Sequence, residues 1–187
     1  MTGASSIRRR DMPPAAATPA LSLRRIVETD GPLLIEANRR ARAYHEPWVD
    51  PFLDREGFDA WFTRIRHGAH VGLLAQIAGS PVPVGVVNLN DIVLGALRGA
   101  FLGYYGYPEW AGRGLMTEAV RHGLDVAFGE LRLHRIEANI QPSNRASLRL
   151  VERLGFRREG YSPRYLFIAG EWRDHERWAR LADDPPA

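Results

Sequence analysis

A short glycine-rich turn, Gly112-Arg113-Gly114, separates an apolar segment at 100–105 from an amphipathic segment that begins at Leu115. If the first segment is a strand and the second a helix, the turn leaves several backbone N–H groups free at the positive end of the helix dipole. A phosphate or pyrophosphate is the natural ligand of such a turn, and Arg113 adds a charge that a phosphate could use. An ordinary helix cap would use the same two glycines, so the turn alone leaves both interpretations open.

The composition excludes several kinds of catalysis. All 25 basic residues counted as Lys+Arg are arginine, and the chain has no cysteine. A Schiff-base lysine, a Walker-type phosphate lysine, a thiol nucleophile, a zinc thiolate site and a disulfide framework are therefore all impossible. The length of 187 residues and the hydrophobic content of 45% fit a globular protein with one good core.

The net charge of +3 does not predict a nucleic-acid-binding face. Arg8, Arg9 and Arg10 against Asp11 leave a charge of +2 on residues 1–20, so the remainder carries only +1. No segment has the apolar core of an export signal or the length of a membrane span. We therefore expect a cytoplasmic enzyme or binding domain, with no direct contact to nucleic acid or membrane.

The elements that must hold the turn in place follow from hydrophobic periodicity. We expect one domain at 21–182, after an Ala/Pro-rich disordered lead at 1–20 and before a short acidic tail at 183–187. The predicted strands outnumber the helices, and some consecutive strands form hairpins. This pattern predicts a mixed α/β sheet and not a regular doubly wound one. The predicted strands are 21–26, 71–77, 82–89, 100–105, 134–140, 156–161, 165–168 and 172–181, and the predicted helices, about four, are 30–42, 58–65, 115–128 and 144–154. The segment 44–52 is broken by prolines and reads as an ordered aromatic loop.

Several further motifs follow the turn in a fixed order. They are Tyr107-Pro-Glu-x-x-Gly112-x-Gly114-x-Met116, His134-Arg135-Ile136, Asn144-x-x-Ser147, Leu154-Gly155-Phe156, Glu159-Gly160-Tyr161 and Gly170-x-Trp172-x-Asp174-His175. Together they resemble the GNAT acetyltransferases, and within these the RimJ/RimL type, which acetylates the N-terminal alanine of ribosomal proteins. The resemblance covers about residues 21–181 and is strongest after Pro83. It implies a mostly antiparallel, twisted sheet whose two central parallel strands splay apart.

The resemblance also implies acetyl-CoA as co-substrate, no metal, and a set of binding residues. Backbone N–H groups of the turn would bind the pyrophosphate, from Trp110, Ala111, Gly112, Arg113, Gly114 and Leu115. The pantetheine would lie like an added strand against the main chain of Leu102, Gly103, Tyr104, Tyr105 and Tyr107. Asn144 would bind the pantetheine arm, although Asn is also among the best helix N-caps.

The sequence departs from the superfamily pattern at two positions. Glu109 replaces the Gln or Arg that begins the glycine motif, and we expect its carboxylate to point away from the phosphates. Many GNAT enzymes place a tyrosine seven residues after the asparagine, to protonate the departing thiolate, but Val151 stands there. Ser147, about one helical turn after Asn144, is the expected replacement, with a solvated serine as the plainer alternative.

No motif in the sequence identifies the general base. An α-amine with a pKa near ~7.8 is already substantially neutral at physiological pH, whereas a lysine near ~10.4 is not, so an N-terminal acceptor needs only a weak base. The candidates are His45 and Glu46 in the aromatic loop, and Tyr105 on the strand before the turn. Desolvation beside Pro47 could raise the pKa of Glu46.

Three functions remain open at this stage. The first, which we favour, is direct transfer of acetyl in a ternary complex to the N-terminal α-amine of a protein such as a ribosomal protein, with alanine as the expected N-terminal residue. The second is acetylation of a small amine such as an antibiotic or polyamine, because one fold accepts many acceptors. The third is a non-catalytic, ribosome-associated module that only binds acetyl-CoA. The chain would act as a monomer or homodimer.

Overall fold

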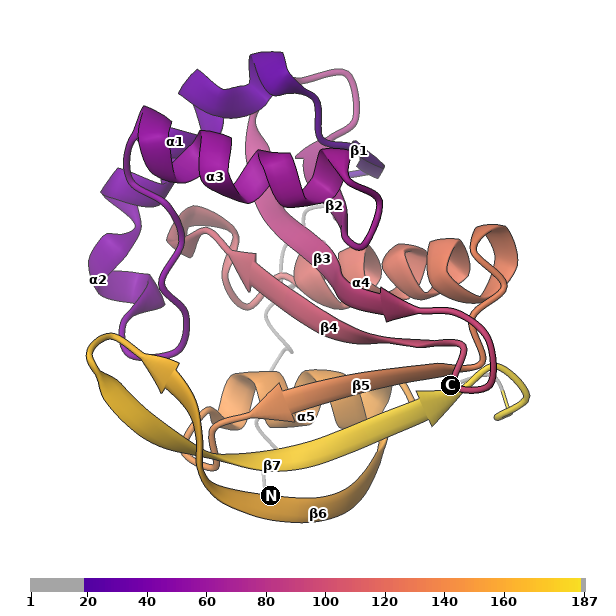
Figure 1. Cartoon of the computed structure of the whole chain (residues 1–187). Coiled ribbons are helices and arrows are strands. Elements are labelled where there is room, and N and C mark those ends of the chain that lie inside the picture. The colour runs from indigo at the N-terminus through magenta and orange to yellow at the C-terminus, as the bar shows by residue number, and fades with distance from the viewer. Residues whose placement is uncertain (1–18, 186–187) are drawn as a thin grey trace, which may run out of the picture.

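The computed structural model describes residues 19–185, so most of the predicted lead and the end of the predicted tail lie outside the described residues. The described part contains a seven-stranded sheet in the order β1-β2-β3-β4-β5-β7-β6 and five α-helices (Figure 1). The strands are β1 (Leu21–Arg25), β2 (Val71–Ile77), β3 (Pro83–Val93), β4 (Gly99–Gly106), β5 (Arg135–Ile140), β6 (Arg157–Ile168) and β7 (Glu171–Leu181). The α-helices are α1 (Gly31–Arg40), α2 (Arg42–His45), α3 (Arg55–Arg66), α4 (Leu115–Asp125) and α5 (Arg145–Arg153).

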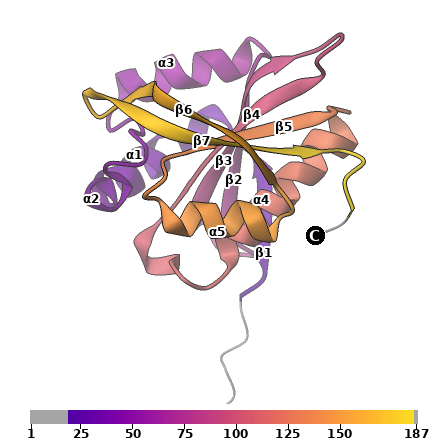
Figure 2. The same ribbon diagram turned by 90° about the horizontal axis from the view of Figure 1, so that it is seen from below.

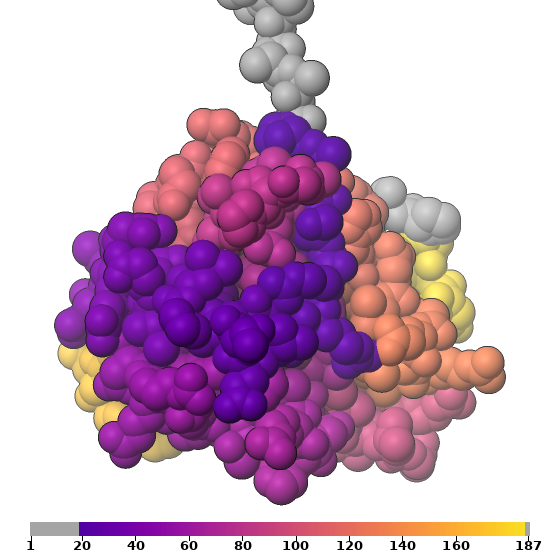
Figure 3. Space-filling view, turned by 90° about the horizontal axis from the view of Figure 1, so that it is seen from above, coloured from indigo at the N-terminus to yellow at the C-terminus, as the bar shows by residue number. Residues whose placement is uncertain are grey.

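Helices cover both faces of the sheet. The first three, α1 to α3, lie on one face, and α4 and α5 lie on the other (Figure 2). Seen from above, the segment that contains α1 and α3 covers a large part of the molecule's surface (Figure 3). Successive side chains of a strand point to opposite faces of the sheet, so each strand contributes residues to both layers.

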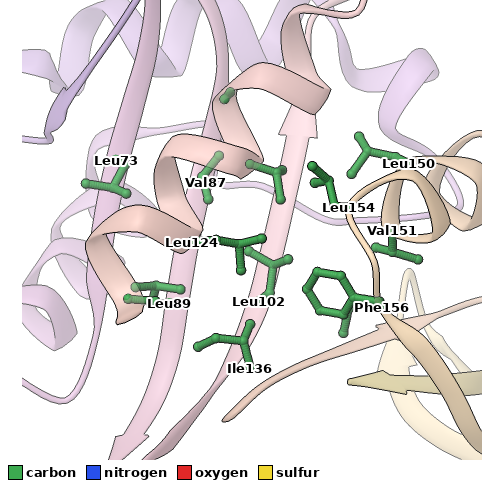
Figure 4. Packing of buried hydrophobic residues seen from close by; sticks show 14 of the residues in the cluster. Leu73, Val87, Leu89, Leu102, Leu124, Ile136, Leu150, Val151, Leu154 and Phe156 are labelled. Atoms are coloured by element: carbon green, nitrogen blue, oxygen red, sulfur yellow. The ribbon is translucent and has the colours of Figure 1, made fainter. Parts of the chain in front are cut away.

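The two faces have separate hydrophobic cores. On the α4–α5 face, Val87, Leu102, Leu124, Ile136 and Phe156 are among the buried members of the larger cluster (Figure 4). On the other face, a smaller cluster gathers around Phe58, which is fully buried and packs against Phe62 and Trp61 as the helical spacing predicts. Burial of these apolar surfaces fixes the sheet between the two layers.

The strands β4 and β5 are parallel and pair over only three residues, from Gly99↔Arg135 to Phe101↔Glu137. Every other neighbouring pair in the sheet is antiparallel. After Phe101 the two strands diverge, so the β5-facing N–H and C=O groups of β4 have no strand partner. The mixed, mostly antiparallel sheet with splayed central strands is thus confirmed.

Two glycines bring the start of α4 close to this opening. Gly85 and Gly106 pair across β3 and β4, and Met116 packs over both. A Cβ on Gly106 would lie 2.8 Å from Cγ of Met116, which is closer than real Cβ contacts allow. The small residues therefore let the first turn of α4 approach the sheet next to the opening.

Three segments differ from the prediction. The prediction of two strands at 156–161 and 165–168 was wrong, because β6 runs continuously through Pro163 with a register shift between Ser162 and Leu166 that absorbs the proline. The aromatic loop begins with the short helix α2. In the predicted tail, Asp184 accepts a hydrogen bond from the Leu181 N–H at 2.8 Å and pairs with Arg157, which holds this part of the tail against β6 and β7.

Candidate functional site

A cavity of about 600 Å³ lies where β4 and β5 diverge. The predicted site residues that line it are Leu102, Gly103, Tyr104, Tyr105, Tyr107, Trp110, Ala111, Gly112, Gly114, Asn144 and Ser147. Arg113, Leu115 and Glu46 are not among its lining residues. The cavity therefore joins the glycine-rich turn at one end to the aromatic loop at the other, through the unpaired edge of β4.

The glycine-rich turn has the geometry of an anion-binding turn. Gly112 and Gly114 adopt φ values of 74° and 78°, and a Cβ built on either would meet nothing within 4 Å. The first helical hydrogen bond runs from the Glu118 N–H to the Gly114 carbonyl, so the N–H groups that precede it in α4 have no helical acceptor. Because these donors lie at the positive end of α4, the turn is suited to a phosphate group.

The side chains around the glycine-rich turn do not all face the cavity. The guanidinium of Arg113 lies over the Trp110 ring, 5.2 Å from its centroid, and the Trp110 indole donates to the Pro83 carbonyl at 3.1 Å. The Leu115 side chain is fully buried in the larger core, so only its N–H can serve a ligand. Glu109 is exposed and does not line the cavity.

The N-terminal end of α5 forms the opposite wall of the cavity. Asn144 caps this helix, since its Oδ1 accepts the Ser147 N–H at 3.1 Å. The Tyr104 hydroxyl donates to the Ser147 carbonyl at 3.3 Å and ties β4 to α5 across the opening. Burial raises the pKa of Tyr104 to about 12, so its hydroxyl keeps its proton at neutral pH. The hydroxyl of Ser147 and the amide nitrogen of Asn144 take no part in these hydrogen bonds.

Three arginines at the same wall were missed by the sequence analysis. Arg145, Arg149 and Arg153 all line the cavity. Their spacing of four residues places them on one face of α5, and this spacing was visible in the predicted helix at 144–154. No carboxylate of the described residues lines this cavity, so its electrostatic environment favours an anionic ligand.

His45 and two tyrosines occupy the α1–α3 side of the opening. His45 is 3% exposed, its Nε2 donates to the Gly106 carbonyl at 3.0 Å, and its ring centroid lies 5.0 Å from that of Tyr105. The Tyr107 hydroxyl donates to Asn38 Oδ1 at 3.1 Å, so the Tyr107 side chain is committed to the packing of α1. Burial raises the pKa of both tyrosines, so Tyr105 stays protonated and cannot accept a proton from an amine.

Glu46 does not reach the cavity. Its carboxylate pairs with Arg42 at 3.0 Å, and its side chain is 53% exposed. The desolvated setting expected beside Pro47 is therefore not observed, because the carboxylate turns to the surface, where an i,i+4 ion pair and water solvate it. Of the three candidate bases, only His45 is a buried, cavity-lining group that can accept a proton.

The loop that follows α2 crosses the opening and is tied to both splayed strands. His45 contacts β4 through Gly106, and Gln141, just beyond β5, donates from Nε2 to the Pro47 carbonyl at 2.8 Å. From β7, His175 lines the same cavity. The roles of Gln141 and His175 were not predicted, since they depend on contacts between segments that are distant in sequence.

Residues 19–185 have neither a cluster of metal-ligating side chains nor a membrane-spanning helix. No group of three or more His, Cys, Asp or Glu side chains in this part of the chain could hold a metal ion. No helix within the same residues is long and apolar enough to cross a membrane.

The profile of the acetyltransferase (GNAT) domain family matches residues 20–157. Among curated relatives, the chain is similar to the [ribosomal protein uS5]-alanine N-acetyltransferase of Escherichia coli, with 42% identity over 92 residues, which are 49% of this chain and 47% of the relative. The chain spans about half the length of the curated relatives it matches.

Solved structures are similar over most of the chain. Mycobacterium smegmatis RimJ in complex with CoA-disulfide has a TM-score of 0.81 and 29% identity, covering 91% of this chain and 86% of that one. Vibrio cholerae spermidine N-acetyltransferase in complex with CoA and spermine has a TM-score of 0.74, covering 87% and 95%, and at 24% identity it shows the fold alone. The splayed sheet, the glycine-rich turn and these matches confirm the predicted resemblance and fold class: the chain belongs to the GNAT acetyltransferase family.

Proposed function

We propose that this GNAT acetyltransferase transfers the acetyl group of acetyl-CoA to the N-terminal α-amine of a protein, with an alanine of a ribosomal protein as the leading acceptor. The observation that carries the proposal is the continuous cavity between β4 and β5, which joins an anion-binding turn to a neutral pocket on the α1–α3 face. One end is suited to phosphates and the other to an uncharged reacting amine.

The residues present fit acetyl-CoA. Gly112 and Gly114 leave open space where side chains would stand, and the free N–H groups of the first turn of α4 supply donors for the pyrophosphate. The arginines of α5 add positive charge along the same wall. The β5-facing main chain of β4 would accept the pantetheine amides as an added strand would. When bound, acetyl-CoA supplies an activated acetyl thioester.

The chain's own groups suit direct transfer to the amine. No cysteine can form an acyl-enzyme, so the amine must attack within a ternary complex. The Ser147 hydroxyl and the protonated Tyr104 hydroxyl lie at the wall where the thiol would be released. We assign Ser147 as the donor to the departing thiolate, because Val151 is buried and carries no proton to give.

The charges around the site favour an α-amine over a polyamine. A polyamine carries several positive charges and would need carboxylates along its path, but the main cavity has three arginines and, among the described residues, no carboxylate. The neighbouring cavity has one carboxylate, Asp50, together with Arg64. A small amine remains the second candidate, supported by the matched region of the Escherichia coli spermidine acetyltransferase at 31% identity.

A panel of acceptors tests the proposal. Thiol release would be followed with acetyl-CoA and three acceptors: a peptide that begins with alanine, the same peptide with its α-amine blocked, and spermidine. We expect turnover with the free peptide only. Turnover with spermidine alone would overturn the protein acceptor, and binding of acetyl-CoA without turnover of any amine would favour the non-catalytic module.

A further inference from the structure

Buried polar atoms without a partner gather around β4. Residues 19–185 contain four buried side-chain nitrogen or oxygen atoms that have no hydrogen-bond partner. Three of them are Nδ1 of His45, Oδ1 of Asn88 and Oδ1 of Asn139, and these residues line the two cavities that adjoin β4. An unpaired buried acceptor destabilises the free protein, so such a cluster marks a place where a ligand supplies donors.

The sheet directs the two asparagines to the same face. Asn88 lies two residues after Val86, which belongs to the core beneath α3, and it stands opposite Gly103 in the register of β3 and β4. Asn139 lies between Ala138 and Ile140, which both face the α4–α5 core, so its side chain points to the α1–α3 face. Both side chains thus belong to the face that carries His45.

Gly103 stands on β4, between the strands that carry these asparagines, and a Cβ there would lie 3.1 Å from Asn90 Nδ2 and 3.9 Å from Asn88 Cβ. It has no side chain, and it lines both the main cavity and a second cavity of about 610 Å³ beneath α3. The two cavities therefore meet at the point of β4 that the acetyl thioester would reach.

The tautomer of His45 follows from its hydrogen bond. A carbonyl can only accept, so the Gly106 contact places the proton on Nε2 and leaves a lone pair on Nδ1. Burial lowers the pKa of His45, which keeps the ring neutral at physiological pH even though the Gly106 carbonyl favours the charged form. A neutral imidazole with a free lone pair can accept one proton.

Among the described residues, no group that faces His45 carries an unpaired charge, so burial decides the protonation state of its ring. From β4, Tyr105 and Tyr107 present phenols that stay protonated. On α2 itself, the Tyr44 ring lies 6.1 Å from the His45 ring, centroid to centroid, and just after the helix Glu46 is paired with Arg42 at the surface. From β7, His175 lines the same cavity, and burial lowers its pKa as well.

We propose that the acceptor amine is held by the neutral oxygen of Asn139 and gives its proton to Nδ1 of His45, which lines the same cavity, while Asn88 in the adjoining cavity contacts the rest of the acceptor. This inference rests on the proposed function and extends it to the groups that recognise the amine. Neutral acceptors suit an α-amine that is already uncharged, whereas a permanently charged ammonium would call for carboxylates. The cluster thus accounts for an acceptor of low pKa, because the cavity that holds His45 and Asn139 has no carboxylate among the described residues.

The proposed transfer forms one bond and breaks one bond. The amine nitrogen forms a bond to the thioester carbonyl carbon while the carbon–sulfur bond breaks. One proton leaves the nitrogen for Nδ1 of His45 and passes on to water, while the departing sulfur takes the proton of the Ser147 hydroxyl, which water replaces. The products are the N-acetyl amine and a free thiol, with no oxidant or reductant required.

The substitution His45→Gln tests the proton transfer. A glutamine amide nitrogen can replace Nε2 as the donor to Gly106 but offers no basic lone pair. We expect kcat with an alanine peptide to fall about a hundredfold or more, with the affinity for acetyl-CoA unchanged. In the wild type, kcat/KM falls in acid first through protonation of the α-amine and then more steeply as His45 becomes protonated, below its ordinary pKa; only the second, steeper loss disappears in the variant. His67→Gln, at an exposed position, is the matched control and should behave as wild type.

Two further measurements complete the test. Asn139→Leu and Asn88→Leu should each raise the KM for the peptide about tenfold without changing the affinity for acetyl-CoA. The ¹⁵N spectrum of histidine-labelled protein should show His45 with its proton on Nε2 at neutral pH. Wild-type kcat and an unchanged acid limb in His45→Gln would overturn the inference, as would a proton on Nδ1. Failure of the proposed function has a different signature, since the wild type would then not acetylate the peptide at all.

Discussion

The glycine-rich turn permits a quantitative prediction about charge. In Gly114→Asp, a carboxylate would stand where the structure has only open space, since a Cβ at Gly114 meets nothing within 4 Å. The side chain would therefore displace no protein atom and would point toward the proposed pyrophosphate position. The backbone at φ 78° disfavours any side chain, but Asn and Asp tolerate this region better than other residues.

The expected loss of affinity follows from Coulomb's law. Two unit charges about 4 Å apart repel by about 1 kcal/mol at the dielectric constant of water and by about 4 kcal/mol at an effective value of 20. This range corresponds to a rise of about fivefold to about a thousandfold in the dissociation constant of CoA. Because the turn is exposed to solvent, high salt should reduce the effect.

Titration calorimetry with CoA measures this loss, and Gly114→Asn is the matched control. The asparagine variant has the same shape and backbone strain but no charge, so the ratio of the two dissociation constants isolates the electrostatic part. Pantetheine, which lacks the phosphates, should bind both variants equally. Equal CoA affinity in the Asp and Asn variants at low salt would refute the assignment of the phosphates to this turn.

Three further predictions concern other parts of the molecule. Ser147→Ala should lower kcat about tenfold to a hundredfold with little change in the affinity for acetyl-CoA, measured by steady-state kinetics and calorimetry; unchanged kcat would leave Ser147 a helix residue only. Asp30→Asn should lower the free energy of unfolding by about 1–3 kcal/mol at pH 7. Burial raises the pKa of Asp30, but hydrogen bonds from Arg24 and the Val27 N–H lower it by more, so the pKa in the folded state is depressed. The stabilisation by the Asp30 carboxylate is therefore present above the unfolded pKa of about 3.9 and is lost as the pH falls through the folded pKa. Denaturant titrations should therefore show the wild type and the variant converging in acid, and a constant difference would contradict the ion pair's role. Gly85→Ala would place a Cβ 2.5 Å from the Tyr105 carbonyl oxygen, so we expect β3 and β4 to shift, with a loss of about 1–3 kcal/mol in thermal denaturation; a wild-type Tm would show that the strands do not pack as described.

Local patterns predicted the elements that position the site. The stripe of Phe58, Trp61 and Phe62 and the hairpin between β2 and β3 depend on neighbours in sequence, and both were confirmed. The turn at Gly112 was also visible, because its glycines and the following helix lie within a few residues. The fold followed from these elements together with the family resemblance.

Groups that meet across the sheet could not be predicted in this way. The tautomer of His45 depends on Gly106, 61 residues away, and the orientation of Asn139 depends on which face of β5 meets α5. Likewise, only the surface contact with Arg42 shows that Glu46 turns away from the cavity. The arginines of α5 are the exception, since their regular spacing was readable before the structure.

The central claim is tested most directly by locating the acetyl group on a product. Purified protein would be incubated with acetyl-CoA and a peptide that begins with alanine and contains one internal lysine, and the product would be sequenced by tandem mass spectrometry. Because the enzyme itself has no lysine, side-chain acetylation in the mixture must come from the peptide. We predict a single acetyl group on the α-amine, and its appearance on the lysine side chain, or its absence from the peptide altogether, would contradict the account.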